Sequence, residues 1–354
     1  MTRFRLLLLN EFKLARTALP IHAVSILQPA LFYLLMSFVL VRATFDVNVV
    51  QPADEAGQRL VAAMREVGSP IGQPYIEPVI ISPDEASATP LRQIITIESR
   101  AGAPTAVQRF GLIDSNQVKN LRNRLTAAAL RLWNEDLGGA AVTVVEHPWL
   151  PQDVPYTVYF GMGMLPMAAF LTAVFIGGVL TAQDFEFRTI AEYRLSPVAP
   201  AWVLAARMTR LVLSALLAAS VLLLVQGWRA GYWPDSVWRV ELILLPVALV
   251  GGGLGITVGL LLRRSIPTLL IGLVATMGCW LLGGAFGLPG GFGGLYEAVS
   301  RLSPNTYALE MLFRRYYGTP VGDPARSMAL LALFAVVGLI IPLPVYHRRV
   351  LRQE

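Results

Sequence analysis

The stretch TAQDFEFRTIAEYRLSPVAP, residues 181–200, carries five charged side chains within eleven residues and separates two long runs of apolar side chains. A charged side chain costs about 2.5 to 3.5 kcal/mol at the centre of a membrane-spanning helix. Threading this stretch through lipid would therefore cost more than roughly 10 kcal/mol. Residues 181–200 must lie outside the bilayer, and the apolar runs on either side must be separate membrane-spanning helices.

The composition of the whole chain is that of an integral membrane protein. Of the 354 residues, 55% are hydrophobic and only 15% are charged, and the mean hydropathy is +0.57. A soluble domain carries about 25% charged residues. The net charge of +6 does not indicate binding of nucleic acid, because the arginines cluster at the edges of apolar runs. We therefore expect membrane lipid, and no nucleic acid, among the partners.

Six apolar runs are long enough to cross a bilayer, which takes about 20 residues. The first occupies residues 18–42, and five more follow within residues 156–354, at 156–182, 211–228, 242–262, 266–284 and 328–346. In the fourth of these six runs, Gly251, Gly255 and Gly259 are spaced four residues apart. This spacing predicts close packing against another helix.

The positive residues predict the orientation of the chain, because arginine and lysine are retained on the cytoplasmic side. One side collects most of them: Arg3, Arg5, Lys13, Arg16, Arg188, Arg194, Arg263, Arg264, Arg348, Arg349 and Arg352. We therefore expect both termini in the cytoplasm. Arg301, Arg314 and Arg315 break the rule before the last run, so residues 285–326 are expected to form a re-entrant or extracytoplasmic segment; an inert loop is the alternative.

Residues 43–155 hold most of the carboxylates of the chain and have the composition of a soluble domain. Helical periodicity runs through residues 55–67 and 115–137, the second opening on an Asp114-Ser115 cap. Residues 77–82, 92–99 and 140–147 alternate as strands do. The fold class predicted is thus an α-helical integral membrane protein of about six transmembrane helices, with a small α/β extracytoplasmic domain between the first and second spans.

The charged stretch itself predicts a short helix over residues 183–196. Helical spacing would place Asp184, Arg188 and Glu192 along one ridge as neighbouring opposite charges. An apolar stripe would run beside this ridge through Phe187, Ile190, Ala191 and Leu195. Ser196-Pro197 would end the helix, because a residue before proline is pushed out of the α region. From the residues alone, an ordinary solvated loop is the alternative.

The run EFRTIAEYRLSPVAPAWVLAAR resembles the cytoplasmic loop of type-2 ABC exporter permeases, the transmembrane subunits of ABC transporters. The family pattern is approximately Glu-x-Gly-Thr-hydrophobic-Glu, then Ser-Pro-Val, then a basic residue ten positions after the proline. The matching positions are Glu186, Thr189, Ser196, Pro197, Val198 and Arg207. This sequence departs from the pattern at Arg188, where glycine is common, and at Glu192, which comes one residue late.

Two further stretches are similar to the same family, and together the three cover most of the membrane portion. FRLLLLNEFKLARTALPIHAVSILQPALFYLLM resembles its amphipathic entry helix and first span, with Pro29 inside the span. LSPNTYALEMLFRRYYG resembles the extracytoplasmic Pro-x-x-x-x-Leu-Glu-x-x-Arg stretch before the last span.

The resemblance implies that residues 183–196 form a coupling helix, which docks into a cleft of a separate ATP-hydrolysing subunit. The residues implied in ATPase coupling are Asp184, Phe185, Glu186, Phe187, Arg188, Thr189, Ile190 and Glu192. Residues 1–17 read as a cytoplasmic amphipathic entry helix, with Phe4, Leu7, Leu8 and Phe12 opposite Arg5, Asn10 and Lys13. Its residues Phe4, Arg5, Leu8, Glu11 and Phe12 would form the other side of the contact, or would serve as a lipid anchor only.

The chain is not expected to be an enzyme. A phosphate-binding GxxxxGK[ST] loop needs a Gly-Lys step, and the two lysines, Lys13 and Lys119, follow Phe12 and Val118. We therefore expect no cofactor in this chain, with ATP and Mg bound by a partner ABC ATPase. The resemblance also implies a second permease copy or a paralogue, and a location in the bacterial or archaeal plasma (inner) membrane.

The function implied is the permease subunit of an exporter that moves an amphipathic or lipid-like compound out of the cytoplasm or inner leaflet. One alternative keeps the ATPase but replaces transport by mechanotransmission or signalling through the outer domain. A membrane-embedded enzyme is less favoured, because His22, His147 and His347 lack the His-Glu-x-x-His spacing of a metalloprotease.

Overall fold

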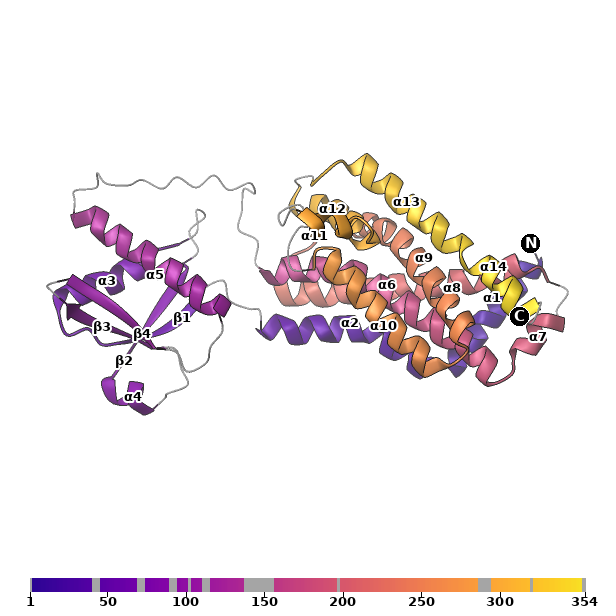
Figure 1. Ribbon diagram of the computed structural model, residues 1–354, viewed down its shortest axis with the longest axis horizontal. Helices are drawn as coiled ribbons and strands as arrows, with labels where there is room; N and C mark the ends of the chain where they lie inside the picture. Colours follow the sequence, from indigo (N-terminus) through magenta and orange to yellow (C-terminus); the bar gives the residue numbers. More distant parts are fainter. Residues whose placement is uncertain are drawn as a thin grey trace. The chain divides into compact units, whose positions relative to one another are not determined.

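The computed structural model describes residues 2–39, 45–68, 74–88, 94–100, 103–109, 115–136, 156–195, 198–285, 294–318 and 321–351. The chain divides into two compact units. The first unit comprises residues 1–41 and 156–354 and contains the helices of the membrane portion, and the second comprises residues 42–155 (Figure 1).

Six helices of the first unit are long and apolar enough to cross a membrane, as the hydropathy of the sequence predicts. They are α2 (Leu19–Val39), α6 (Tyr156–Glu186), α8 (Pro200–Ala230), α9 (Val237–Leu262), α10 (Ser265–Leu282) and α13 (Pro324–Ile340). Beyond α13 the helical path continues through α14 (Pro342–Tyr346) and a π-helical turn (His347–Leu351).

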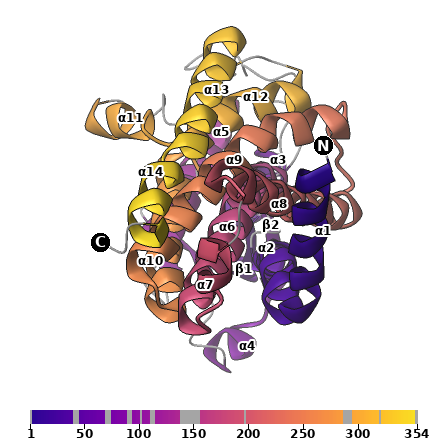
Figure 2. The same ribbon diagram turned by 90° about the vertical axis from the view of Figure 1, so that its right-hand side faces the viewer.

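Helix α6 is the centre of the bundle. It packs against α2, α8, α9 and α10, and Figure 2 shows these helices around it in an end-on view. Over the most apolar 18 residues of α6, 94% are buried inside the chain, whereas the same share for α10 is 22%. Because α6 carries no charge between Tyr156 and Gln183, it can be enclosed on all sides without burying an unpaired charge.

The glycines of α9 bring that helix against α6, as their spacing predicts. A Cβ atom on Gly251 would meet backbone atoms of Phe170, and one on Gly255 would meet the carbonyl oxygen of Val174. The third glycine, Gly259, faces the carbonyl oxygen of Gly178 in the same way. The two backbones are therefore in direct contact over about two turns.

Exposed tryptophans near the two ends of α8 indicate how it sits in a bilayer. Trp202 and Trp228 are 56% and 76% exposed, and tryptophan is enriched at membrane interfaces. They are 26 residues apart, which is about 39 Å along a helix. A bilayer with its headgroup regions is about 40–45 Å thick, so these two residues lie near its opposite surfaces.

The short elements at one end of the bundle are α1 (Thr2–Thr17) and α7 (Ile190–Leu195). They lie at the end that also holds both termini (Figure 1), and α1 packs against α8. The predicted single helix over residues 183–196 is not observed. Instead α6 continues to Glu186, a turn follows, and α7 begins at Ile190.

The third span was predicted to begin after Arg210, and this boundary is wrong. Helix α8 begins eleven residues before Leu211, at Pro200, so Arg207 and Arg210 are part of the helix, and both are buried. Hydropathy counts each residue by itself and takes no account of the carboxylates that pair with an arginine. It therefore places such arginines outside the bundle.

The segment before the last span contains α11 (Gly294–Ser300) and α12 (Pro304–Tyr317). Ser303 caps α12 by accepting from the N–H of Asn305 at 3.2 Å. Most of α12 is buried, and it packs against α6, α9 and α13. Such burial is not that of an inert loop. Two of the arginines that break the charge rule are paired here, Arg301 with Glu297 and Arg315 with Asp235.

The second unit contains a four-stranded sheet with the order β2-β1-β3-β4. Strand β1 is parallel to β2 and β3, whereas β3 and β4 are antiparallel. Helix α3 connects the parallel pair β1 and β2, and α3 also packs against α5. The elements are β1 (Phe45–Val50), α3 (Glu55–Glu66), β2 (Ile76–Ile81), α4 (Pro83–Ala88), β3 (Ile94–Arg100), β4 (Ala103–Arg109) and α5 (Ser115–Asp136).

This unit has its own hydrophobic core. Val47, Val49 and Ile95 from the sheet pack against Met64 of α3 and Leu121 of α5. The two predicted helices and the predicted strands at 77–82 and 92–99 are confirmed. The sequence reading missed β1, α4 and β4, and the strand predicted at 140–147 and the Asp114 of the predicted cap lie outside the described residues.

The close contact of α6 and α9 leads to a prediction. We expect Gly255→Ala to lower the melting temperature of the purified protein, because the added Cβ would overlap the Val174 backbone and separate the helices. The expected loss is about 1–3 kcal/mol. Gly278→Ala is the matched control, because a Cβ there meets nothing within 4 Å. Equal melting temperatures for the two variants would contradict the packing role.

Candidate functional site

The candidate site is a buried cluster of charges centred on Arg207 of α8. Arg207 Nη2 lies 2.6 Å from Asp184 Oδ2 on α6, and Nη1 donates to the Thr181 hydroxyl at 3.0 Å. On its other side, Arg207 Nε lies 3.6 Å from Glu11 Oε1 on α1. One guanidinium group thus joins α8 to α6 and to the N-terminal helix α1.

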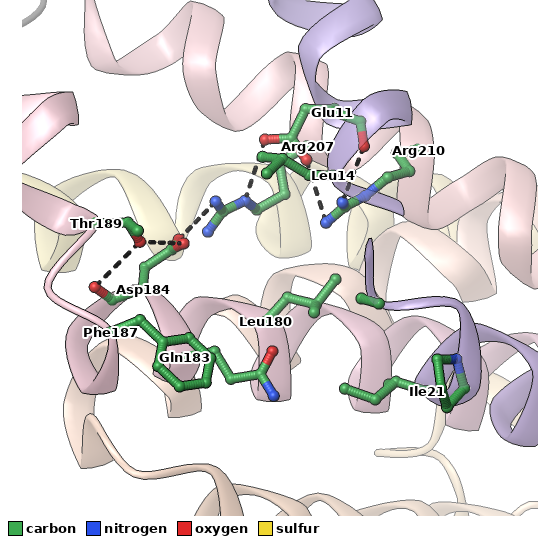
Figure 3. A pocket seen from close by; sticks show the side chains of 12 residues that line it. Glu11, Leu14, Ile21, Leu180, Gln183, Asp184, Phe187, Thr189, Arg207 and Arg210 are labelled. Atoms are coloured by element: carbon green, nitrogen blue, oxygen red, sulfur yellow. Dashed lines mark hydrogen bonds and ion pairs between the residues drawn. The ribbon is translucent and has the colours of Figure 1, made fainter. Parts of the chain in front are cut away.

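Arg210, one turn further along α8, completes the attachment of α1. Its Nη2 lies 3.1 Å from Glu11 Oε2, and its Nη1 donates to the backbone carbonyl oxygen of Glu11 at 3.2 Å. Figure 3 shows Glu11 above the two arginines, with Asp184 on the far side of Arg207. Arg207, Arg210 and Glu11 are all buried.

Helix α7 is attached to the same cluster through Tyr193. Arg207 Nη2 donates to the Tyr193 hydroxyl at 3.1 Å, and the guanidinium lies 5.5 Å from the centre of the Tyr193 ring. Burial raises the pKa of the Tyr193 phenol, although the charge of Arg207 opposes this effect. Thr189, in the turn before α7, donates to Asp184 Oδ1 at 3.2 Å.

The cluster is stable in a buried position because its charges cancel. Arg207 and Arg210 face Asp184 and Glu11, so the four groups carry no net charge. Arg207 lies five residues beyond Trp202, which places it about 8 Å further into the bundle. Removing one partner from such a buried pair leaves an uncompensated charge, at a typical cost of about 3–5 kcal/mol. The cluster therefore fixes α1, α6, α7 and α8 relative to one another.

The predicted ridge of Asp184, Arg188 and Glu192 does not form. Its helical spacing is broken at Arg188, which has a φ of 61° and lies in the turn between α6 and α7. Asp184 pairs with Arg207 instead. In the family pattern that the sequence resembles, this position is glycine, the residue that takes a positive φ without strain. The position at which the sequence departs from the family pattern is therefore the position with a left-handed backbone.

Glu186 and Phe185 connect the end of α6 to the start of α10. Glu186 Oε1 accepts from the backbone N–H of Ser265 at 2.8 Å, and Oε2 accepts from its hydroxyl at 2.5 Å. A carboxylate in this position caps the N-terminus of α10. The Arg263 guanidinium lies 5.3 Å from the centre of the Phe185 ring.

The structure separates the predicted coupling residues into two groups. Asp184, Phe185, Glu186 and Thr189 make contacts within the chain, and Ile190 is buried. Phe187, Arg188 and Glu192 are exposed, and Phe187 is 70% exposed. Glu186 is also exposed, but both of its carboxylate oxygens are bonded to Ser265.

The predicted residues of α1 divide in the same way. Phe4 and Leu8 are half-buried, and the Phe4 ring lies 5.7 Å from that of Trp202, whereas Glu11 is buried in the charge cluster. Arg5 is exposed, and Phe12 is exposed together with Leu6 and Leu9. Phe12 is thus more exposed than Phe4, because the buried face of α1 is built around Glu11.

A cavity of about 500 Å³ lies beside the cluster. The elbow between α1 and α2 forms one wall, with Leu14, Ala18 and Ile21, and α6 forms the other, with Leu180 and Gln183. Asp184, Thr189 and both cluster arginines also line it (Figure 3).

Glu310 of α12 lies in a second, smaller cavity, of about 120 Å³, between α12 and α13. Ser327 donates to its Oε2 at 2.5 Å. Burial raises the pKa of the Glu310 carboxyl, and the Ser327 hydrogen bond opposes this effect.

Sequence reasoning did not assign roles to Arg210, Tyr193, Thr181 or Gln183. Arg207 was marked by its spacing from Pro197, and Arg210 follows it by three residues on the same helical face. That pair was a usable signal, because two arginines inside one apolar helix require acidic partners. No signal in the sequence points to Tyr193 or Gln183.

These features define a multi-pass membrane protein with a buried charge cluster near one end of its helical bundle. The chain matches the ABC-2 family transporter proteins over residues 91–343, which is more than half of its length, and it therefore belongs to this family. It is the membrane permease subunit of an ABC-2 type transporter. A search of curated proteins finds no match to the chain.

Members of this family generally pair with a separate ATPase subunit, and the permease itself is typically not catalytic. Among the described residues, no group of three or more His, Cys, Asp or Glu side chains is arranged to hold a metal ion. The family match extends from β3 of the second unit through the sixth span.

The charge cluster leads to a second prediction. Arg207→Gln should lower the free energy of unfolding by about 3–5 kcal/mol, because Asp184 and Glu11 lose a buried partner. In the double variant with Asp184→Asn, the loss should be smaller than the sum of the two single losses. Thermal unfolding in detergent measures each value, with Arg188→Gln as the exposed control. Strictly additive losses would show that the two residues do not interact.

The backbone of Arg188 leads to a third prediction. Arg188→Gly should raise the melting temperature, because the left-handed conformation costs a residue with a side chain about 1–2 kcal/mol. Part of this gain is offset by the greater freedom of glycine in the unfolded chain, which is about 0.5–1 kcal/mol. Arg188→Ala removes the same side chain but keeps the strain, so it is the control. If alanine stabilises as much as glycine, the side chain and not the backbone is responsible.

Proposed function

We propose that this chain is the transmembrane subunit of an ATP-driven exporter, which moves an amphipathic or lipid-like compound outward, powered by a separate ABC ATPase. The observation that carries the proposal is the charge cluster of Glu11, Asp184, Arg207 and Arg210. It attaches an exposed end segment to the central helix of the bundle, which is the connection that a transporter driven from outside the membrane requires.

The distribution of positive charge supports a cytoplasmic position for this end. Lys13, Arg16, Arg188, Arg264 and Arg348 belong to segments that meet there, because both termini lie at this end (Figure 1) and Glu186 bonds to the start of α10. Positive residues are retained on the cytoplasmic side. Both termini would then be cytoplasmic, and the unit formed by residues 42–155 would be extracytoplasmic.

The exposed side chains of the turn and of α7 are the proposed docking surface for the ATPase. Phe187 and Leu195 are 70% and 87% exposed, and they stand among the exposed charges of Arg188 and Glu192. Apolar anchors surrounded by charged residues are typical of binding surfaces. We place ATP and Mg in the partner subunit.

Movement of this surface would reach the membrane helices through the cluster. Thr189 and Tyr193 bind Asp184 and Arg207, and Arg207 belongs to α8 while Asp184 belongs to α6. A displacement of α7 must therefore move α6 and α8 or break charged hydrogen bonds. We infer that closure of the ATPase drives these helices together with α1 as one body.

A transport path requires more than one bundle, because α6 fills the centre of this one. The outer helices α10 and α13 are each only 22% buried within the chain over their apolar windows, and α2 is 28% buried. We propose that some of this apolar surface meets a second permease copy or a paralogue, and that the path lies between the two chains.

A second function is favoured by one observation, the independent core of the unit at residues 42–155. Under this alternative, ATP hydrolysis changes the state of that unit and nothing crosses the membrane. Reconstituted vesicles distinguish the two functions. In an exporter, ATP moves an amphiphile across the bilayer, whereas a signalling protein hydrolyses ATP with no movement of any amphiphile.

The docking surface leads to a fourth prediction. Phe187→Ala should reduce binding of the ATPase roughly tenfold, since an anchor residue contributes about 1.4 kcal/mol or more. Co-purification of the ATPase with the tagged permease and measurement of ATP hydrolysis in vesicles give the readout. Glu186 is left intact in this test, because its loss would also uncap α10.

Leu295→Ala is the matched control for this prediction, because Leu295 is an 80% exposed apolar residue of α11 at the other end of the bundle. It should leave both binding and hydrolysis unchanged. Unaltered binding in the Phe187 variant would exclude this surface as the docking site.

A further inference from the structure

The cavity beside the charge cluster has the form of a small-molecule site. Its volume of about 500 Å³ lies within the range of about 300–1,000 Å³ that is usual for such sites. It has no part in the ATPase contact proposed above, apart from Phe187 at its edge. Its walls come from α1, α2, α6 and α8, so a bound molecule would touch three of the helices that the cluster joins, α1, α6 and α8.

The lining of the cavity is divided into an apolar and a polar part. Leu14, Ile21 and Leu180 supply hydrocarbon surface, and Gln183, Asp184 and Thr189 supply polar atoms. In Figure 3 the Gln183 side chain extends from α6 toward Ile21, between Leu180 and Phe187. A molecule that matches both parts must be an amphiphile.

The depth of the cavity agrees with the boundary between lipid headgroups and acyl chains. Trp202 marks one surface of the bilayer, and the cluster arginines lie five and eight residues further along α8, or about 8–12 Å deeper. The elbow between α1 and α2 marks the point where the chain enters the apolar span that begins at Leu19. This depth is the same whichever leaflet surrounds this end of the bundle.

The charges on the wall select the kind of headgroup. Arg207 and Arg210 are neutralised by Glu11 and Asp184, and the other lining residues are uncharged. An anionic headgroup would therefore meet no net positive charge. A zwitterionic headgroup, which is also neutral overall, matches this field without a charge left unpaired.

Two polar groups of α6 have hydrogen-bonding capacity that the described residues do not use. The Asp184 carboxylate accepts from Arg207 and Thr189, whereas a carboxylate can accept about four hydrogen bonds. The Gln183 amide has no side-chain partner among the described residues. Asp184 can therefore accept from a donor cation, and the amide N–H of Gln183 can donate to an adjacent phosphate.

We propose that this cavity binds the headgroup of an aminophospholipid, with a primary ammonium group at Asp184 and the phosphate at Gln183. The acyl chains leave along Leu180 and Ile21 into the bilayer. The lipid would stabilise the elbow between α1 and α2 against α6. The site is independent of which compound the transporter moves.

The first test compares two lipids that differ only in the methylation of the headgroup nitrogen. Native mass spectrometry of the full-length protein in detergent would be used to titrate phosphatidylethanolamine and phosphatidylcholine with identical acyl chains. Both headgroups are zwitterionic, but a primary ammonium donates three hydrogen bonds and a trimethylammonium donates none. We expect the ethanolamine lipid to bind roughly tenfold more tightly, the size of one charge-assisted hydrogen bond.

Equal binding of the two lipids, or a preference for phosphatidylcholine, would overturn the proposal without any mutation. Phosphatidylglycerol with the same acyl chains tests the charge argument. Preferred binding of this anionic lipid would show that the arginines act as free cations, and the proposed headgroup would be wrong.

Variants assign the binding to this cavity. Gln183→Leu should lower binding of both zwitterionic lipids, because both carry the phosphate that Gln183 would bind, and Ala18→Phe, which fills the cavity from the elbow, should lower binding of the ethanolamine lipid by a similar factor. Gln28→Leu is the matched control, because Gln28 is an equally half-buried glutamine on α2 that does not line the cavity. Unchanged binding of the ethanolamine lipid in both cavity variants, each shown to be folded by its melting temperature, would place the lipid elsewhere.

Discussion

A guanidinium group inside an apolar helix must be paired, and this requirement organises the end of the bundle that contains α1 and α7. Arg207 lies within a helix that crosses the bilayer, so its charge is stable there only if carboxylates lie close enough to pair with it. The partners come from α1 and α6, separated from Arg207 by almost 200 residues in one case. The N-terminal helix is therefore not a free surface anchor, because its buried Glu11 holds it against α8.

The same requirement decides which polar residues remain for recognition. Asp184 and Glu186 occur in a stretch that resembles a docking motif, yet Asp184 neutralises Arg207 and Glu186 caps α10. Phe187, Arg188, Glu192 and Leu195 are exposed and have no part in this pairing and capping. A motif shared within a family can thus contain residues that hold the motif in shape beside residues that contact the partner, and the contacts within the chain separate the two.

The spans were predictable because hydropathy over about 20 residues is a strong signal that no tertiary contact reverses. The glycine contacts of α9 were also predictable, since the four-residue spacing has few other uses in a membrane helix. The sheet of the second unit was found in part, because β4 has little of the alternation that marks a strand.

The internal geometry of residues 183–196 was not predictable. Local spacing favours a pairing of Asp184 with Arg188. The carboxylate pairs instead with Arg207, 23 residues away. Arg207 is buried and must be neutralised there, whereas Arg188 is exposed to solvent.

The left-handed turn at Arg188 follows from this competition. Asp184 must stay on the face of α6 that meets α8, and Tyr193 must reach the same guanidinium from α7. A straight helix from Gln183 to Ser196 would carry Tyr193 nine residues beyond Asp184, about 13 Å along the axis, too far for both to bind one group. The chain therefore has to turn back between them, and a residue with positive φ at position 188 permits that reversal within three residues. The strain at Arg188 is in this sense a consequence of the charge buried at Arg207, and the two features have to be understood together.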